Sequence, residues 1–331
     1  MAGIQAPLAI SMGEPSGIGP DLILRLFSQR AELKLPPFVV YGNAAFLEAR
    51  AARLGAQVAI GSAGADFAST LPVLDIEGMV PDHPGAPSAL SGKMVMEAIA
   101  RAVDDTLRGV CRGLVTAPIH KGVLYAAGFK YPGHTEYLAA LCAVPGNAPR
   151  LPVMMLAHDE LRTVPLTIHV PLQDVPRLIT TDLILQTTRI VAHDLRARFG
   201  IAEPRIGISG LNPHAGEGGT IGRQEADIII PAIAALVHEG IDAQGPFPAD
   251  TLFFPDHWRQ YDAVIAMYHD QALIPIKTVA FDEAVNVTLG LPIVRTSPDH
   301  GTAFDLAGTG KGSHASFLAA IRLADKMTAR A

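Results

Sequence analysis

The chain has 331 residues, of which 49% are hydrophobic, and a formal net charge of −6. This length and hydrophobic content allow a large buried core and favour two lobes over one. The acidic balance gives no basic surface for nucleic acid, no apolar run reaches the roughly 18 residues of a membrane span, and the N-terminal segment carries no export signal, so we expect a cytoplasmic protein.

Short apolar runs alternate along the chain with amphipathic stretches of helical period. The apolar runs predict buried strands at 8–11, 38–41, 114–117, 153–156, 163–170, 205–211 and 263–268. The amphipathic stretches predict helices at 20–29, 44–54, 91–107, 181–199, 225–239 and 313–327. Alternation of this kind predicts an α/β fold, with a mainly parallel sheet covered by helices on both faces.

Three segments have glycines or a helix start that could contact a phosphate. Residues 12–20 (MGEPSGIGP) lack the G-x-G-x-x-G order of a dinucleotide fingerprint, so a tight strand-to-helix turn is an equal alternative. Residues 131–136 (YPGHTE) place His134 and Thr135 at a helix start, where anions bind, although an ordinary N-cap is the alternative. Residues 212–223 carry four glycines, which indicates either a ligand-shaped loop or a mobile surface turn.

Three histidines, His169, His214 and His269, each follow a predicted strand. Ligands bind outside the carboxyl ends of the strands in open α/β sheets, and three imidazoles there could bind a divalent metal such as Zn²⁺. A histidine at a strand end is more often a hydrogen-bonded loop residue, and this spacing matches no local metal motif. With only Cys111 and Cys142 in the chain, a thiolate cluster is excluded.

The last third of the chain is rich in groups that bind anions. Lys277, Asn286 and Arg295 follow His269 and could bind a phosphate and a carboxylate, although isolated charges are more often solvated surface residues. The segment HGTAFDLAG at 300–308 is the most distinctive string in the sequence.

These motifs together resemble the 4-hydroxythreonine-4-phosphate dehydrogenase family of pyridoxal phosphate biosynthesis. The resemblance runs nearly end to end, through GEPSGIGPD (13–21), TAPIHKG (116–122), GHTEYL (133–138), LNPHAGEGGTIGRQE (211–225), MYHDQALIPIK (267–277) and NVTLGLPIVRTSPDHGTAFDLAG (286–308). HGTAFDLAG also resembles the NAD-binding loop of isocitrate and isopropylmalate dehydrogenases, which bind NAD without a Rossmann fingerprint.

The resemblance implies an isocitrate/isopropylmalate-dehydrogenase-like fold, a two-lobe α/β/α architecture with a central cleft. It implies a cofactor-side lobe formed by residues 1–130 plus 290–331, and a lobe for metal, substrate and dimerisation formed by 131–289. It further implies a homodimer whose active site lies at the subunit interface.

The family's functional residues match positions of this sequence. The resemblance implies that His169, His214 and His269, drawn from both subunits, hold a divalent metal, with Zn²⁺ expected first and Mg²⁺ or Co²⁺ as alternatives. It implies substrate contacts at His134, Thr135, Lys277, Asn286 and Arg295, and catalytic roles for Lys277 and Asp250. Lys277 could accept a proton or bind phosphate. NAD or NADP is expected at His300, Gly301, Ala303 and Asp305.

The implied reaction is the oxidation of 4-phosphohydroxy-L-threonine to 2-amino-3-oxo-4-phosphooxybutanoate, which decarboxylates to 3-amino-2-oxopropyl phosphate. A related dehydrogenase acting on threonate or erythronate 4-phosphate, or on a dihydrodiol dicarboxylate, is one alternative. A phosphate acyltransferase, which shares a similar fold, is an alternative of another class. A non-catalytic metal- or phosphate-binding protein is a third, which the complete set of polar residues disfavours.

Overall fold

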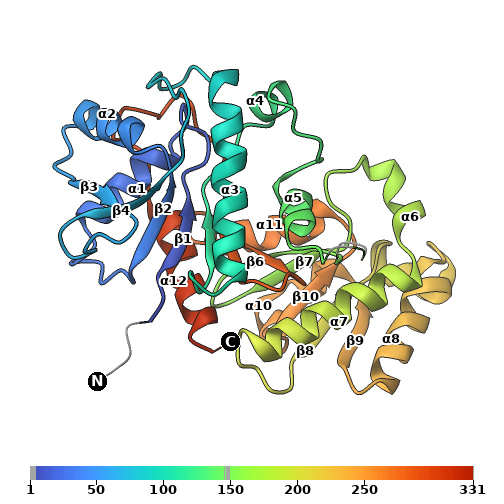
Figure 1. The fold of residues 1–331 in the computed structure, drawn as a ribbon. Helices are drawn as coiled ribbons and strands as arrows, with labels where there is room; N and C mark the ends of the chain where they lie inside the picture. The colour runs from blue at the N-terminus through green and yellow to red at the C-terminus, as the bar shows by residue number, and fades with distance from the viewer. Residues whose placement is uncertain (1–4, 145, 147–149, 331) are drawn as a thin grey trace. The chain divides into compact units, whose positions relative to one another are not determined.

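The computed structural model describes residues 5–144, 146 and 150–330, and the chain divides into two compact units (Figure 1). Unit 1 comprises Met1–Arg150 and Leu291–Ala329, and unit 2 comprises Leu151–Gly290 and Arg330–Ala331. The sequence predicts the first boundary at 130/131, so residues up to 150 belong to a different unit from the one expected. The predicted lobe ends at 1–4 and 331 lie outside the described residues, and the roles of the lobes stay predictions.

Unit 1 contains a parallel sheet with the strand order β3-β4-β2-β1-β5-β12. Strands β1 and β2 are buried along their whole length, as expected for a parallel sheet covered on both faces. The strands are β1 (Leu8–Ser11), β2 (Phe38–Gly42), β3 (Ile60–Ser62), β4 (Leu71–Asp75), β5 (Leu114–Thr116) and β12 (Arg295–Pro298).

The helices of unit 1 begin and end where the sequence supplies caps and apolar stripes. The Asn43 side chain accepts a hydrogen bond from the Phe46 N–H at 2.9 Å and starts α2, which ends at Gly55 with φ 64°. Helix α3 packs on β1, β2 and β5 through a buried stripe that includes Val95, Ile99 and Val103 (Figure 1). The helices are α1 (Gly19–Ser28), α2 (Ala44–Leu54), η1 (Ala89–Ser91), α3 (Gly92–Leu107), α4 (Lys121–Ala126), α5 (His134–Leu141) and α12 (Ala315–Thr328).

Unit 2 contains a mixed sheet with the strand order β11-β6-β7-β10-β8-β9. Strands β7, β10, β8 and β9 pair in parallel, whereas β6 runs antiparallel to both β7 and β11. The link from β6 to β7 is a short turn closed by a hydrogen bond from His158 N–H to Leu161 O at 3.0 Å, and so short a link permits only an antiparallel pair. The strands are β6 (Val153–Ala157), β7 (Arg162–Pro165), β8 (Arg205–Ser209), β9 (Asp242–Phe247), β10 (Ala263–Ala266) and β11 (Val285–Leu289).

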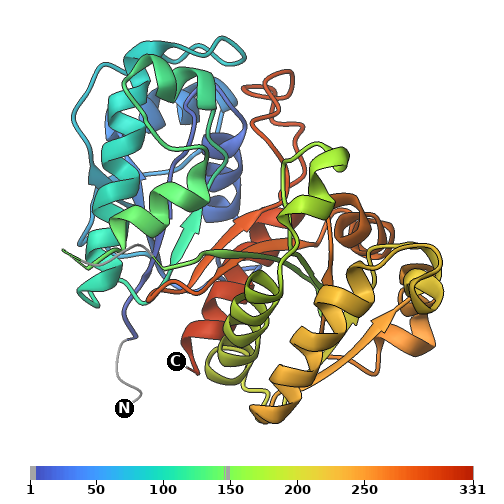
Figure 2. The same cartoon turned by 90° about the vertical axis from the view of Figure 1, so that its right-hand side faces the viewer.

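The helices of unit 2 include α7, which has 17 residues, and the shorter α8, and these two lie side by side in Figures 1 and 2. Trp258, Val264 and Ile276 belong to the apolar core of this unit. Its helical segments are η2 (Leu172–Asp174), α6 (Val175–Leu178), α7 (Thr181–Ala197), η3 (Pro213–Gly219), the π-helical η4 (Glu225–Ile229), α8 (Ile230–His238), α9 (Ala249–Leu252), α10 (Pro255–Trp258) and α11 (His269–Ala280).

The predicted α/β class is confirmed in both units, but three strands were predicted too long by two residues or more. The strands predicted at 163–170, 205–211 and 263–268 end at Pro165, Ser209 and Ala266. Beyond these points Leu166 and Met267 are still buried, whereas Leu211 is partly buried and Val170 is exposed, so hydrophobicity alone did not mark where the sheet pairing stops. Within the described part of the chain, no helix combines the length and the apolar character needed to cross a membrane.

Candidate functional site

The three candidate metal ligands follow three neighbouring parallel strands of unit 2. His169 lies four residues beyond β7, His214 five beyond β8, and His269 three beyond β10. Strand β10 pairs with β7 on one side and with β8 on the other. Because neighbouring parallel strands end at the same edge of a sheet, the topology places the three loops together at its carboxyl edge.

Two of the imidazoles lie against one another. The ring centroids of His169 and His269 are 5.6 Å apart, and the Nδ1 atom of His269 is 2.7 Å from a carboxylate oxygen of Asp270. A carboxylate on one ring nitrogen fixes the tautomer and leaves Nε2 for another partner. A pocket of about 260 Å³ is bordered by both histidines, and Thr167, Leu172 and Tyr268 also line it.

The loop that carries His214 has an unusual backbone. His214, Ala215 and Glu217 have φ angles of 54°, 51° and 42°, values that side chains with a Cβ rarely adopt. The buried Glu225 carboxylate anchors this loop, because its Oε1 accepts hydrogen bonds from the N–H groups of Leu211 and Asn212, both at 2.8 Å. Burial opposes ionisation of Glu225, but the hydrogen bonds from Asn212 and the backbone outweigh it and hold its pKa below the usual value.

A divalent metal fits the donor type and the sheet edge. His169, with φ 42°, shares the strained backbone of His214, and such strain concentrates at functional sites. Among residues 5–144, 146 and 150–330, however, no three His, Cys, Asp or Glu side chains come close enough together to hold a metal ion. One chain therefore brings two of the predicted imidazoles together and leaves the third outside the group.

The other site residues predicted in unit 2 lie on three elements. Lys277 lies on α11, two turns after His269, and both border a pocket of about 400 Å³. The Lys277 ammonium lies 5.5 Å from the centre of the Phe281 ring. Asn286 lies on β11, and its buried Oδ1 has no hydrogen-bond partner in the protein. Asp250 is exposed in the first turn of α9, which packs beside η3.

The site residues predicted in unit 1 include a buried arginine next to a histidine. Arg295 opens β12, is 4% exposed, and donates from Nη2 and Nε to Thr116 Oγ1 at 2.6 and 3.1 Å. Burial lowers its pKa to about 10, so the guanidinium stays charged at neutral pH. His134 and Thr135 begin α5 after Gly133, as predicted, and no side chain caps this helix.

His134 is held in its neutral form. Burial, and secondarily the positive charge of Arg295, keep the pKa of His134 well below its ordinary value of 6.5. The residue retains some exposed surface, but its Nε2 atom is buried and has no partner within the protein. A neutral imidazole beside a guanidinium can contact an anion without adding a second positive charge.

The candidate cofactor loop follows β12 in unit 1. Gly301 and Asp305 are exposed, Ala303 has φ 41°, and the buried Nε2 of His300 has no hydrogen-bond partner in the protein. Most buried polar groups in native proteins have a partner, so an unsatisfied one points to a ligand or water. Such atoms occur at three predicted site residues, namely His134, Asn286 and His300.

Comparisons with known proteins identify the family of the chain. The model of the family described as "Pyridoxal phosphate biosynthetic protein PdxA" matches residues 34–324. The chain belongs to this family. The chain is 52% identical to a 4-hydroxythreonine-4-phosphate dehydrogenase of Bradyrhizobium diazoefficiens, over 98% of this chain and 97% of that protein.

Members of the PdxA family and their relatives share the fold. A crystal structure of 4-hydroxythreonine-4-phosphate dehydrogenase from Klebsiella pneumoniae has a TM-score of 0.88 and 38% identity, with 98% of this chain and all of that chain covered. A terephthalate 1,2-cis-dihydrodiol dehydrogenase from Burkholderia xenovorans has a TM-score of 0.66 and 28% identity, with 97% and 98% covered. The predicted family and fold class are thereby confirmed.

Three further residues of the family motifs, Glu225, Gln271 and His120, make contacts near the predicted site residues or loops, although the sequence predicted no role for them. Glu225, at the end of the 211–225 motif, anchors the His214 loop. Gln271, in the 267–277 motif, accepts from the Ser209 hydroxyl at 2.9 Å and donates to Gly210 O at 2.9 Å, which ties the ends of β8 and β10 together. His120 packs edge-on against Phe304, with ring centroids 5.2 Å apart. Their place in these motifs was the only available signal.

Proposed function

We propose that this chain is an NAD(P)- and metal-dependent 4-hydroxythreonine-4-phosphate dehydrogenase in pyridoxal 5′-phosphate biosynthesis. The observation that carries the proposal is the membership of the PdxA family, with relatives named for this activity that match nearly the whole chain at about half identity. The intact set of predicted site residues, three of them with unsatisfied buried polar atoms, supports it.

The residues of unit 1 bind the anionic part of the substrate in this proposal. The Arg295 guanidinium presents several donors in a planar fork, a geometry suited to a phosphate or a carboxylate. Its burial strengthens that interaction, because few water molecules compete. The neutral His134 would donate or accept one hydrogen bond at Nε2, and Thr135 would add a hydroxyl.

The residues of unit 2 act on the hydroxyl group that is oxidised. His169, His214 and His269 would hold the divalent metal, and a bound metal supplies Lewis-acid activation of that hydroxyl. Lys277 would accept the hydroxyl proton or bind the phosphate, Asn286 would orient the substrate by hydrogen bonding, and Asp250 would assist near the metal ligands. Zn²⁺ suits three imidazoles first, with Mg²⁺ or Co²⁺ as alternatives.

The loop of unit 1 that contains His300, Gly301, Ala303 and Asp305 binds the dinucleotide in this proposal. NAD or NADP supplies the hydride acceptor. Oxidation of the secondary alcohol gives 2-amino-3-oxo-4-phosphooxybutanoate, together with a reduced cofactor and one proton. This 3-oxo acid loses CO₂ readily because the resulting enolate is stabilised, and the product is 3-amino-2-oxopropyl phosphate.

The proposed enzyme is a cytoplasmic homodimer whose two subunits share each metal site. The third histidine ligand that one chain leaves outside the group would then come from the second copy. Ile274, on α11, and Phe281, which directly follows this helix, are 64% and 72% exposed, and both border the same pocket as His269 and Lys277. A second copy of the chain that covers α11 would bury both.

The test is the formation of NADH or NADPH from 4-phosphohydroxy-L-threonine by wild type and by His214→Ala, each with and without a chelator. We expect turnover by wild type only, lost with chelator and restored by Zn²⁺, Co²⁺ or Mg²⁺. Turnover of threonate or erythronate 4-phosphate, or of a dihydrodiol dicarboxylate, in place of the phosphorylated amino acid would replace the substrate assignment. Acyl phosphate formation without cofactor reduction would overturn the dehydrogenase assignment.

A further inference from the structure

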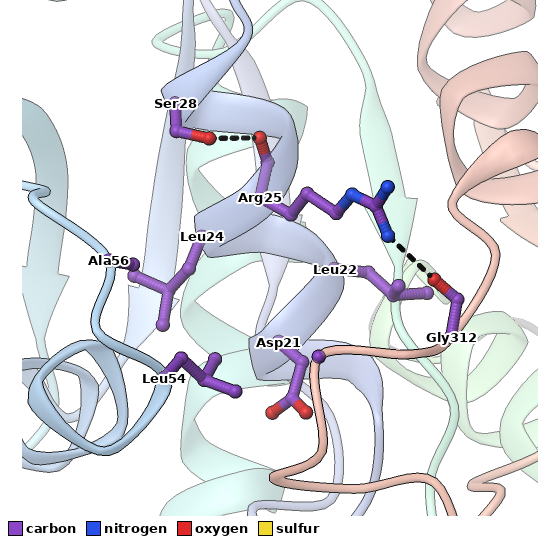
Figure 3. Close-up of a pocket in the computed structure, with 9 residues that line it drawn as sticks. Asp21, Leu22, Leu24, Arg25, Ser28, Leu54, Ala56 and Gly312 are labelled. Atoms are coloured by element: carbon purple, nitrogen blue, oxygen red, sulfur yellow. Dashed lines mark hydrogen bonds between the residues drawn. The ribbon is translucent and has the colours of Figure 1, made fainter.

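The first helix of the chain and its N-cap contact residues 302–312, which include most of the candidate cofactor loop, at three points. The N–H of Ile18 donates to Thr302 O at 2.9 Å, the Asp21 Oδ2 accepts from the Gly308 N–H at 2.6 Å, and Arg25 Nη1 donates to Gly312 O at 3.2 Å. Figure 3 shows Asp21 and Arg25 on one side of α1, with Arg25 reaching Gly312. Asp21 and Arg25 are four residues apart and so lie on one face of α1, and the backbone of the N-cap Ile18 adds the third contact.

A fully buried arginine fixes the middle one of these three contacts. Arg50, on α2, has no exposed side-chain surface, and its Nη1 donates to the other oxygen of Asp21 at 2.6 Å. Its Nε donates to Asp82 Oδ1 at 2.6 Å, and its Nη2 donates to Pro15 O at 2.8 Å. Burial of Asp82 opposes its ionisation, but hydrogen bonds from Arg53 and Arg50 outweigh this and lower its pKa.

The loop is packed so closely that small displacements are resisted. A Cβ atom on Gly308 would lie 2.6 Å from Pro84 Cγ, and one on Gly312 would lie 2.1 Å from Ile18 Cδ1. Within the same loop, Ala303 has a strained φ, and Gly301 and Asp305 are exposed. The Leu306 N–H donates to Ala303 O at 3.0 Å inside the loop, and Phe304 packs on His120, so the contacts with α1 add to these.

We propose that Asp21 and Arg50 are positioning residues for the dinucleotide, because they clamp the 300–308 loop through the Gly308 N–H. The inference rests on the proposed function only in taking this loop as the dinucleotide site. It gives the GEPSGIGPD segment a role different from phosphate binding, since its last residue, Asp21, is one member of the clamp. Neither residue needs to touch the dinucleotide.

The critical variant is Asp21→Asn, which keeps the size of the side chain. An amide presents one acceptor and one donor, so whichever way it turns, its NH₂ faces either the Gly308 N–H or the Arg50 guanidinium, and one hydrogen bond is lost. Arg50→Lys is the second variant, because lysine keeps the positive charge but lacks the planar guanidinium that binds Asp21, Asp82 and Pro15 O at the same time. Arg53→Met is the matched control, because Arg53 binds the same Asp82 from the surface, where its side chain is 46% exposed.

Three measurements on the full chain test the proposal. Amide hydrogen exchange reports on residues 300–312 without any ligand, calorimetry reports the Kd for NAD, and steady-state kinetics reports the KM for each substrate. For Asp21→Asn we expect exchange at Gly308 to accelerate about tenfold or more, and the Kd and KM for NAD to rise about tenfold. The KM for the phosphorylated substrate should stay within about twofold, and Arg53→Met should match wild type within about twofold.

Failure of the proposed function and failure of the positioning role give different results. Wild type that binds no dinucleotide would overturn the proposed function, while the exchange measurement would still report on the clamp. Unchanged exchange at Gly308, or faster exchange with an unchanged Kd for NAD, would overturn the positioning role. If Asp21→Asn yields no folded protein, Arg50→Lys is judged by the same criteria, and an equal rise in both KM values would indicate a merely structural role.

Discussion

Left-handed backbone angles mark several of the site residues. Among the described residues, the non-glycine positions with positive φ are Lys34, His169, His214, Ala215, Glu217 and Ala303. Three of these positions were predicted from the sequence as metal ligands or cofactor contacts. A residue with a Cβ in this region costs about 1–3 kcal/mol and persists only where the surroundings impose it. The strain therefore supports a functional role for His169, His214 and Ala303, independently of the family match.

The glycine that follows β1 should tolerate no side chain. Gly13 has φ 76°, and a Cβ there would lie 2.4 Å from Pro118 O, whereas Gly55 has φ 64° and open space around it. We expect Gly55→Ala to lower the free energy of unfolding by about 1 kcal/mol. Gly13→Ala should cost about 1–3 kcal/mol more, because the surrounding backbone must also move. Denaturant unfolding of both variants measures the difference, and equal losses would contradict the steric argument.

His134 should make the protein less stable in mild acid. The native state keeps His134 neutral, with its pKa lowered by burial and by Arg295, whereas the unfolded chain binds a proton below about pH 6.5. Stability is therefore independent of this group above that pH and falls below it, by up to about 1.4 kcal/mol per pH unit. His134→Gln should reduce the slope in denaturant unfolding, and His238→Gln, on the surface, should not. An unchanged slope in His134→Gln would contradict the neutral assignment.

Among the elements, the loop between β8 and α8 depends on one buried carboxylate. Glu225 begins the π-helical η4 and reaches back to the N–H groups of Leu211 and Asn212. Its Oε2 also accepts from Asn212 Nδ2 at 2.8 Å. A helix start that hydrogen-bonds back to the end of the preceding strand makes the position of His214 depend on η4.

Glu225→Gln should therefore disturb metal binding as well as stability. The oxygen of the amide can still accept from the N–H groups of Leu211 and Asn212, but its NH₂ then faces the Nδ2 donor of Asn212, so that hydrogen bond is lost at a cost of about 1–3 kcal/mol. We expect metal affinity, measured by titration with Zn²⁺, to fall about tenfold or more, as for other residues that orient ligands. Glu217→Gln, on the same loop but exposed, is the control. A loss of stability without a loss of metal affinity would limit Glu225 to folding.

The elements were predicted best where periodicity and caps agree. Helix α2 matches its predicted range, since Asn43 and Gly55 bracket it, and α3 begins one residue after its predicted start and ends where predicted. Helix α11 was missed because Pro275 lies inside it and no side chain caps its start. The order of β7, β10 and β8, which brings the three histidine loops to one edge, depends on long-range pairing that no local pattern encodes.

At the scale of the whole molecule, the proposed dimer should depend on the exposed face of α11. Ile274→Glu together with Phe281→Glu places two charges where the second copy would pack, and we expect a monomer by light scattering with strongly reduced turnover. Met79→Glu is the matched control, since Met79 is as exposed as Phe281 but lies in unit 1. A double variant that remains dimeric would move the interface elsewhere.

The resemblance of long motifs supplied the family and the α/β fold, both of which are confirmed. It could not supply the unit boundary at 150/151, because residues 131–150 belong to unit 1 through packing such as that of Tyr137 on Phe129, with ring centroids 5.1 Å apart. The sequence also could not show that His134, Asn286 and His300 each have a buried polar atom without a hydrogen-bond partner, because hydrogen bonding of a side chain depends on the folded structure.

The interrupted sequence of unit 1 has a consequence for synthesis on the ribosome. Unit 2 is contiguous from 151 to 290, whereas β12 and α12, which complete the other unit, come last. Until β12 emerges, β5 has an open edge and Thr116 lacks its arginine partner. In nascent chains, unit 2 should therefore become resistant to protease first. The N-terminal strands of unit 1 should stay sensitive to protease until about the last forty residues, which include β12, have been synthesised.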